Sequence, residues 1–167
     1  MVIGELIQGQ SFEARAKPFA EFELSLKEAP ILSLNYVFDA EVERLGGIAY
    51  QCEYYSQRWQ LQFFRTPYLQ RESYRLLCDG SLVLATGVLR PLRSADITFS
   101  DGTVWHCHTG LLETVVFDSK AVQVLHTSPR PGFIMGGSSI RVDEPTDHEH
   151  ILPSLMVLLH FTTHTSR

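Results

Sequence analysis

A chain of 167 residues is long enough to bury the core of one domain, and we expect a single domain over residues 1–167. Hydrophobic residues make up 44% of the chain and charged residues 20%, which excludes an intrinsically disordered protein. The formal net charge of −5 predicts a protein without affinity for nucleic acid.

The start of the chain shows little periodicity, and residues 1–18 are interpreted as a lead-in segment. They lack the basic start and the long apolar run of a signal peptide. The cysteines Cys52, Cys78 and Cys107 are odd in number and widely spaced, which argues against a disulfide framework and for a reducing compartment. We therefore expect a cytoplasmic protein without a transmembrane segment, as a monomer or weak dimer.

The next part of the chain, residues 19–145, is predicted to form β-strands. Alternation of apolar and polar residues predicts early strands over 19–26, 31–42, 48–54 and 59–63. Asp79-Gly80 and Asp101-Gly102 predict hairpins, because these pairs tolerate the positive φ angles of a type I′ turn. A third hairpin is expected around residues 118–120, followed by short strands over 133–135 and 139–142.

A helix is predicted over residues 146–163. Residues 151–161 are apolar on nearly every side of a helix, so they must be surrounded by a core or by lipid. This run is too short to span a bilayer, which needs about twenty apolar residues. Thr146 and Glu149 match a capping box, but the residue before a proline avoids the α region, so the regular helix is placed from Pro153. These features together predict a mainly β fold, an antiparallel β-barrel of hairpins with one buried apolar C-terminal helix.

Positive charge is concentrated in the middle of the chain. Residues 57–93 hold six arginines and two acids, whereas both flanking segments are acidic. Guanidinium groups suit bidentate contacts with carboxylate or phosphate, so a small anionic ligand is one prediction. The candidate ligand-binding residues are Arg58, Arg65, Arg75, Arg90 and Arg93. The alternative is that these arginines pair with acidic residues of the same domain.

The motif His106-Cys107-His108 offers a second kind of site. Residues i and i+2 of a strand point to the same face, so both imidazoles can reach one divalent transition metal. With Glu113 they form a His-x-His-x4-Glu pattern that resembles the first metal-binding motif of cupins, which implies a metal-binding protein or metalloenzyme. The flanking glycines and the second cupin motif are missing. The alternative is a pair of solvent-facing histidines that need no cofactor.

The remaining candidate residues do not predict catalysis. His160 lies in the apolar helix and is expected to be a core residue with a satisfied hydrogen bond. The run Gly136 to Ser139 lacks the Gly-Lys-Ser/Thr ending of a P-loop and is interpreted as a tight turn. The chain contains no Gly-x-Ser-x-Gly elbow, so no catalytic residue is predicted.

The order of these features resembles the tubby C-terminal-like superfamily, which includes the LURP-one-related proteins and the phospholipid scramblases. Tyr74 to Thr86 and Thr114 to Val124 resemble its hairpins, and Leu155 to Leu159 resemble its C-terminal helix. The resemblance covers residues 20–163 and implies a closed antiparallel barrel of up to twelve strands with the helix in its bore. Tubby proteins bind phosphoinositide headgroups through lysines and arginines, but no lysine of that site is matched here. The resemblance therefore implies a non-enzymatic binding or interaction module, for an anionic or lipid-headgroup ligand or a protein partner.

Overall fold

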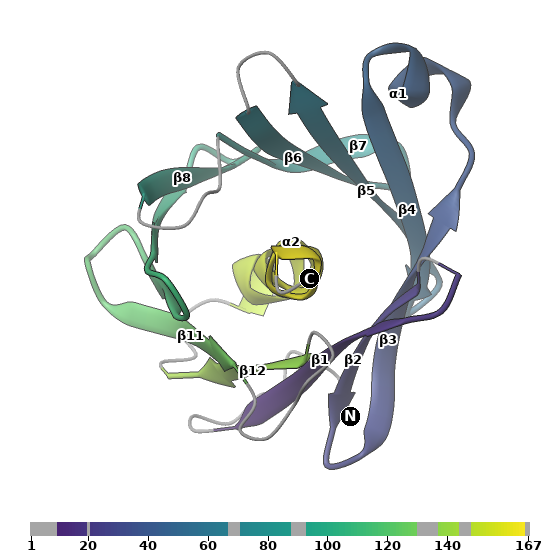
Figure 1. Ribbon diagram of the computed structural model, residues 1–167. Coiled ribbons are helices and arrows are strands. Elements are labelled where there is room, and N and C mark those ends of the chain that lie inside the picture. The colour runs from purple at the N-terminus through teal and green to yellow at the C-terminus, as the bar shows by residue number, and fades with distance from the viewer. Residues whose placement is uncertain are drawn as a thin grey trace.

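Twelve antiparallel strands form a closed barrel in a computed structural model that describes residues 10–19, 21–66, 71–87, 93–129, 137–143 and 148–165 (Figure 1). Each strand pairs with the next one along the chain, and the last strand closes the ring against the first. The strands are β1 (Ser11–Lys17), β2 (Glu21–Leu26), β3 (Ala29–Val37), β4 (Gly47–Tyr54), β5 (Gln57–Thr66), β6 (Arg71–Cys78), β7 (Ser81–Thr86), β8 (Arg93–Phe99), β9 (Val104–Thr109), β10 (Thr114–Phe117), β11 (Gln123–Pro129) and β12 (Gly137–Val142). The helices are α1 (Ala40–Arg44) and α2 (His148–Thr165). The predicted mainly β, antiparallel barrel is confirmed.

Helix α2 lies within the ring of strands and fills the bore (Figure 1). Its apolar residues are buried on every side of the helix, including Ile151, Leu155 and Leu158. They pack against inward-facing side chains of the wall such as Phe12 and Leu76. Each large side chain buried in this way stabilises the fold by about 1.5–3 kcal/mol. The prediction of a buried C-terminal helix is confirmed. Because the helix fills the bore, the surface open to a ligand is the outside of the barrel.

The uniform up-and-down order separates the strand connections into two sets. Connections 27–28, 55–56, 79–80, 100–103 and 118–122 lie at one end, which we call the tight-turn end. The other end, which we call the loop end, carries connections that include 18–19, 38–46 and 110–113. Helix α2 starts at the tight-turn end, where His150 Nε2 lies 2.8 Å from Asp101 Oδ2. It ends towards the loop end, where Ser138 Oγ donates to Thr162 Oγ1.

Helix α1 was not predicted from the sequence, which favoured one strand over residues 31–42. Strand β3 ends at Val37, and the Asp39 side chain accepts hydrogen bonds from the backbone N–H groups of Glu41 and Val42. This N-cap stabilises a helical turn instead of further extended backbone. Val42 then packs on the outer face of the barrel, where a Cβ added at Gly47 would lie 2.9 Å from it.

Four further expectations need correction or lie outside the described residues. Strand β1 falls inside the segment 1–18 that was interpreted as a lead-in; its inward positions are Phe12 and Ala14, a weak apolar pattern. Helix α2 begins at His148, so the start predicted at Pro153 is wrong, and burial of the helix outweighs the one hydrogen bond that proline removes. The predicted strand over 133–135 and the cap at Thr146 lie outside the described residues. None of the described helices is long and apolar enough to cross a membrane.

Candidate functional site

An open pocket of about 770 Å³ lies on the outer face of β4, β5 and β6, towards the tight-turn end. These strands alternate, so that Cys52, Trp59 and Leu61 face the core while every second residue faces outwards. The pocket is lined by Gln51, Glu53, Ser56, Arg58, Gln60, Leu77, Asp79 and Gly80. We call it the β4–β6 groove, and we consider it the candidate binding site.

Two hairpin turns fix the backbone of Arg58 at the edge of this groove. The backbone N–H of Arg58 donates to Asp79 Oδ1 at 3.0 Å, and the Asp79 N–H donates to the Arg58 carbonyl at 2.8 Å. Asp79 and Gly80 have φ angles of 49° and 85°, the left-handed backbone that the Asp-Gly pair predicted. The β6–β7 turn is thus tied to the start of β5.

The groove carries charges of both signs. Glu53 lies directly opposite Arg58 in the β4–β5 register, and Asp79 lies beside it. Two carboxylates therefore accompany one guanidinium, together with the amides of Gln51 and Gln60. Such a surface matches a ligand that has an anionic group close to a cationic or hydroxyl group.

The amide side chains are linked to helix α1. Gln62 Nε2 donates to Gln60 Oε1 at 2.7 Å, and Gln60 Nε2 donates to Asp39 Oδ2 at 3.4 Å. Asp39 is the N-cap of α1. This chain of contacts holds the groove-lining Gln60 in place and connects the floor of the groove to the loop end.

A smaller pocket of about 310 Å³ adjoins the groove between β3 and β4. These strands pair through only three residue pairs, from Asn35 opposite Gln51 to Val37 opposite Ala49. Gln51 and Glu53 line both pockets. Their side chains are therefore reachable from either side of β4.

The five candidate arginines are not brought together by the described structure. Arg58 and Arg65 stand at opposite ends of β5, about 23 Å apart at 3.3 Å per residue. Arg75 faces outwards on β6, with its guanidinium carbon 5.9 Å from the Phe64 ring centre. Arg93 begins β8, but its side chain is not among those described, and Arg90 lies outside the described residues. Among the described members of this set, Arg58 is the one that lines the groove.

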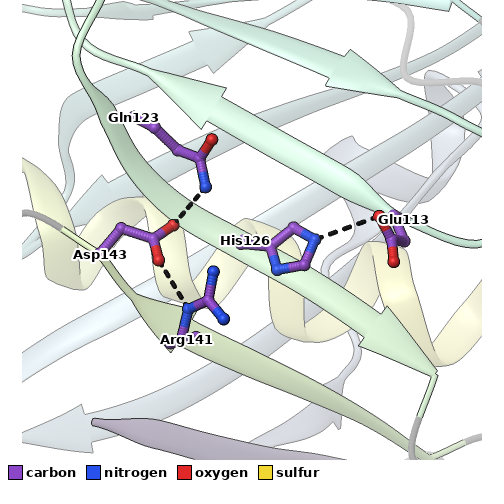
Figure 2. Close-up of polar contacts among 5 residues, drawn as sticks. All are labelled: Glu113, Gln123, His126, Arg141 and Asp143. Atoms are coloured by element: carbon purple, nitrogen blue, oxygen red, sulfur yellow. Dashed lines mark hydrogen bonds and ion pairs between the residues drawn. The ribbon is translucent and has the colours of Figure 1, made fainter. Parts of the chain in front are cut away.

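The predicted metal ligands lie on the outer face of the opposite wall, each with its own partner. His106 and His108 do share a face of β9, as the alternation predicted. His106 Nδ1 lies 2.7 Å from Asp96 Oδ1, and His108 Nδ1 lies 2.7 Å from Ser94 Oγ. Glu113 instead contacts His126 Nε2 at 3.3 Å (Figure 2). The described residues hold no group of three His, Cys, Asp or Glu side chains arranged to bind a metal ion.

The neighbouring polar residues of this wall are also paired. Asp143 accepts from Gln123 Nε2 at 2.7 Å and from Arg141 Nε at 2.6 Å (Figure 2). Exposed pairs of this kind contribute about 0–1 kcal/mol each. We interpret the outer face of β10, β11 and β12 as a solvated sheet surface and prefer the groove as the site.

His160 is a core residue, as predicted. Its Nδ1 lies 2.8 Å from the Tyr74 hydroxyl oxygen in the buried interior. The rings of Phe22, Tyr50 and Phe63 surround it, with centroids 4.8, 4.8 and 4.9 Å away. This arrangement places the imidazole in the packing between helix and wall.

The cysteines are unlike nucleophilic thiols. Burial raises the pKa of the Cys52 thiol to about 12, with a smaller contribution from Cys78. Burial also raises the pKa of the Cys107 thiol to about 11. Reactive cysteines have a lowered pKa and an accessible thiolate, whereas Cys52 and Cys107 are buried in the hydrophobic core.

Sequence reasoning singled out Arg58 but missed its partners. The break between the strands expected over 48–54 and 59–63 indicates a turn around Ser56-Gln57. The observed turn is Tyr55-Ser56, one residue earlier, and this position is what places Glu53 opposite Arg58. The contact with Asp79 joins two hairpins and leaves no local signal in the sequence.

Comparison with known proteins adds no relative. The chain matches no protein-family model, no curated protein and no solved structure. The fold defines a closed antiparallel barrel of twelve strands with a C-terminal helix in its bore, which is consistent with a tubby-like fold. Membership of that superfamily stays a prediction.

Proposed function

We propose that the protein is a non-enzymatic binding module whose β4–β6 groove binds a small ligand with an anionic group. The observation that carries this proposal is that Arg58 lines an open pocket together with Glu53, its cross-strand neighbour, and Asp79, which binds its backbone N–H. The groove is built on strands and two-residue turns, which supply the rigidity that a specific site requires. The bore is filled by α2, so the outer wall is where a ligand meets polar side chains.

The charges of the groove favour a zwitterionic ligand over a simple anion. A phosphate group pairs with the guanidinium of Arg58, and an ammonium group on a short chain then reaches Glu53 or Asp79. Leu77 offers an apolar contact for the carbon atoms between them. A free phospholipid headgroup such as glycerophosphoethanolamine has this arrangement, and an ethanolamine phospholipid displays the same chemistry on a membrane.

Isothermal titration calorimetry with glycerophosphoethanolamine, and with inorganic phosphate alone, tests the proposal. We expect glycerophosphoethanolamine to bind more tightly than phosphate, and its binding to weaken as salt screens the charges. Arg58→Gln should weaken it at least tenfold. Arg75→Gln is the matched control, because Arg75 faces outwards on the next strand but does not line the groove.

Two results would contradict the proposal. One is the absence of measurable heat with glycerophosphoethanolamine for a wild-type protein that melts cooperatively. The other is an equal loss of affinity in both arginine variants, which would indicate attraction by overall charge. Tighter binding to vesicles containing phosphatidylethanolamine than to the free headgroup, lost in Arg58→Gln, would identify the membrane as the source of the ligand.

A further inference from the structure

Large hydrophobic side chains are exposed unequally at the two ends of the barrel. At the loop end, Phe19, Leu111, Leu112 and Phe38 are 100%, 75%, 73% and 68% exposed. Leu45 and Ile48 lie exposed beside them at the same end. The exposed large hydrophobics of the tight-turn end are less accessible, with Tyr55 the most exposed at 59%. Among the described residues, the loop end therefore presents most of the water-exposed apolar surface.

The exposed apolar side chains described at the loop end do not form one patch. The connection that carries Phe38 lies between β3 and β4, and the one that carries Leu111 and Leu112 lies between β9 and β10. These connections are six strands apart in a ring of twelve, so they stand on opposite sides of the barrel mouth. At 4.8 Å between strands, they are separated by roughly 20 Å. Phe19, between β1 and β2, marks a third point on the same rim.

Fixed backbone geometry holds these side chains outwards. Phe19 has a φ of 65°, a left-handed conformation that is uncommon for a bulky aromatic residue. Leu111 and Leu112 occupy a turn closed by the Gly110 N–H, which donates to the Glu113 carbonyl at 2.7 Å. Turn positions normally carry Gly, Asn, Asp, Ser or Pro, so the turns themselves do not require leucine or phenylalanine at these positions.

We propose that the loop end docks on the surface of a phospholipid membrane, with the apolar side chains of its turns inserted between the headgroups. Three apolar points spread around the mouth can all reach a broad, flat and deformable surface. A protein partner would instead favour one contiguous apolar core with a polar rim. Charges of both signs lie next to these points: Lys17 pairs with Glu21 across the turn that carries Phe19, and Glu113 follows Leu112. Docking therefore depends on burial of apolar surface and does not require anionic lipid.

The proposal separates membrane contact from ligand binding. The β4–β6 groove opens towards the tight-turn end, so it remains in water when the loop end is docked. Arg58→Gln should then leave binding to phosphatidylcholine vesicles unchanged, whether or not the groove binds glycerophosphoethanolamine. Failure of either proposal is thus distinguishable from failure of the other.

Co-sedimentation of the full chain with phosphatidylcholine vesicles tests membrane docking. We expect the wild-type protein to sediment with vesicles to the same extent at low and high salt. The double variant Leu111→Asp/Leu112→Asp should lower the partition coefficient at least tenfold, and Phe19→Asp should lower it severalfold. The matched control Tyr55→Asp/Leu82→Asp changes exposed side chains at the tight-turn end and should stay within twofold of wild type.

The replaced side chains are largely exposed, so thermal melting should confirm that all variants remain folded. Wild-type protein that stays in the supernatant would overturn the proposal, as would equal losses in the loop-end and control variants. Light scattering without lipid adds a further check. A wild-type dimer that Leu111→Asp/Leu112→Asp dissociates would show that the loop end is a protein interface, and would also overturn membrane docking.

Discussion

The two ends of this barrel connect the same strands in different ways. At the tight-turn end, several connections are two residues long and use left-handed backbone, as at Lys27-Glu28, Tyr55-Ser56 and Asp79-Gly80. At the loop end, the connection 38–46 contains a helix, and 110–113 presents two leucines to water. The tight-turn end therefore does little more than connect its strands. The loop end carries exposed apolar residues that connecting the strands does not require.

Aspartate side chains satisfy the backbone at the tight-turn end. Asp79 accepts from the N–H of Arg58, and Asp101 accepts from the N–H of Thr103 at 2.9 Å. Asp118 accepts from two backbone N–H groups of its own turn, at 2.8 and 3.0 Å. Local hydrogen bonding therefore explains these turns, whereas the apolar side chains in the turns of the loop end are the ones that we propose insert into a membrane.

The largest effect is expected from a substitution that disrupts α2, the helix that runs from one end of the barrel to the other. Leu158→Asp places a charge in the fully buried face of α2, where no ion pair is available among the described neighbours. Truncating a buried leucine to alanine already costs about 2–5 kcal/mol, against a total stability of about 5–15 kcal/mol for a typical domain. We expect the variant to lose cooperative melting in circular dichroism.

The exposed residue Leu112 supplies the control for this experiment. Leu112→Asp introduces the same charge at a side chain that is mostly in water, so its melting temperature should match that of the wild type. A soluble Leu158→Asp protein with wild-type melting would show that α2 is not the core of the barrel.

A smaller effect is expected from Gly47→Ala, which disturbs the loop end alone. The new Cβ would lie 2.7 Å from the Phe64 ring and 2.9 Å from Val42, so α1 must move away from the wall. Overpacking of this kind costs about 1–3 kcal/mol, which lowers the melting temperature by about 2–4 °C per kcal/mol in a chain of this size. Vesicle binding should weaken as well, because α1 lies between Phe38 and Leu45.

Gly87→Ala is the matched control, since a Cβ at that position meets nothing within 4 Å. Its melting temperature and vesicle binding should equal those of the wild type. Equal effects of the two alanine substitutions would contradict the packing of α1 on Gly47.

The smallest effect is expected at the tight-turn end from Asp101→Asn. Hydrogen bonds from Thr103, with a contribution from His150, lower the pKa of the Asp101 carboxyl in the folded protein. A carboxyl with a lowered folded-state pKa stabilises the fold above its unfolded pKa of about 4, and this contribution is lost as the pH falls through the folded-state value. The variant should melt below the wild type at pH 7, and the difference should disappear in strong acid.

Melting curves across this pH range check the prediction, with Glu28→Gln as a control for loss of one exposed acid at the same end. A difference in melting temperature that is independent of pH would show that the ionised carboxylate does not stabilise this end.

Much of the fold was predictable because its signals are local. Asp79-Gly80 and Asp101-Gly102 encode their turns by the φ angles they tolerate, and the apolar run 151–161 requires a buried helix wherever it packs. Strand β1 was missed because its inward alanine adds little hydrophobic signal and its pairing with β12 is long-range. Helix α1 was missed because the apolar residues after Val37 are compatible with either a strand or a helix. The single N-cap residue Asp39 decides between the two.

The candidate site was less predictable because it depends on register. Arg58 was visible as one of several arginines, but its position beside Glu53 follows from a turn, Tyr55-Ser56, that lacks the usual Asn-Gly or Asp-Gly signature. Its contact with Asp79 joins residues 21 positions apart. Successive connections alternate between the two ends, so grouping Phe19, Phe38 and Leu111 at one end requires a correct count of the strands before each of them. One missed strand assigns a connection to the wrong end.

Hydrogen–deuterium exchange, measured with and without phosphatidylcholine vesicles, tests the different roles of the two ends most directly. We expect slower exchange with vesicles in residues 38–46 and 110–113, and unchanged exchange in residues 54–58 and 78–81. Slower exchange at the tight turns, or exchange at the loop end that vesicles do not slow, would contradict membrane docking by the loop end.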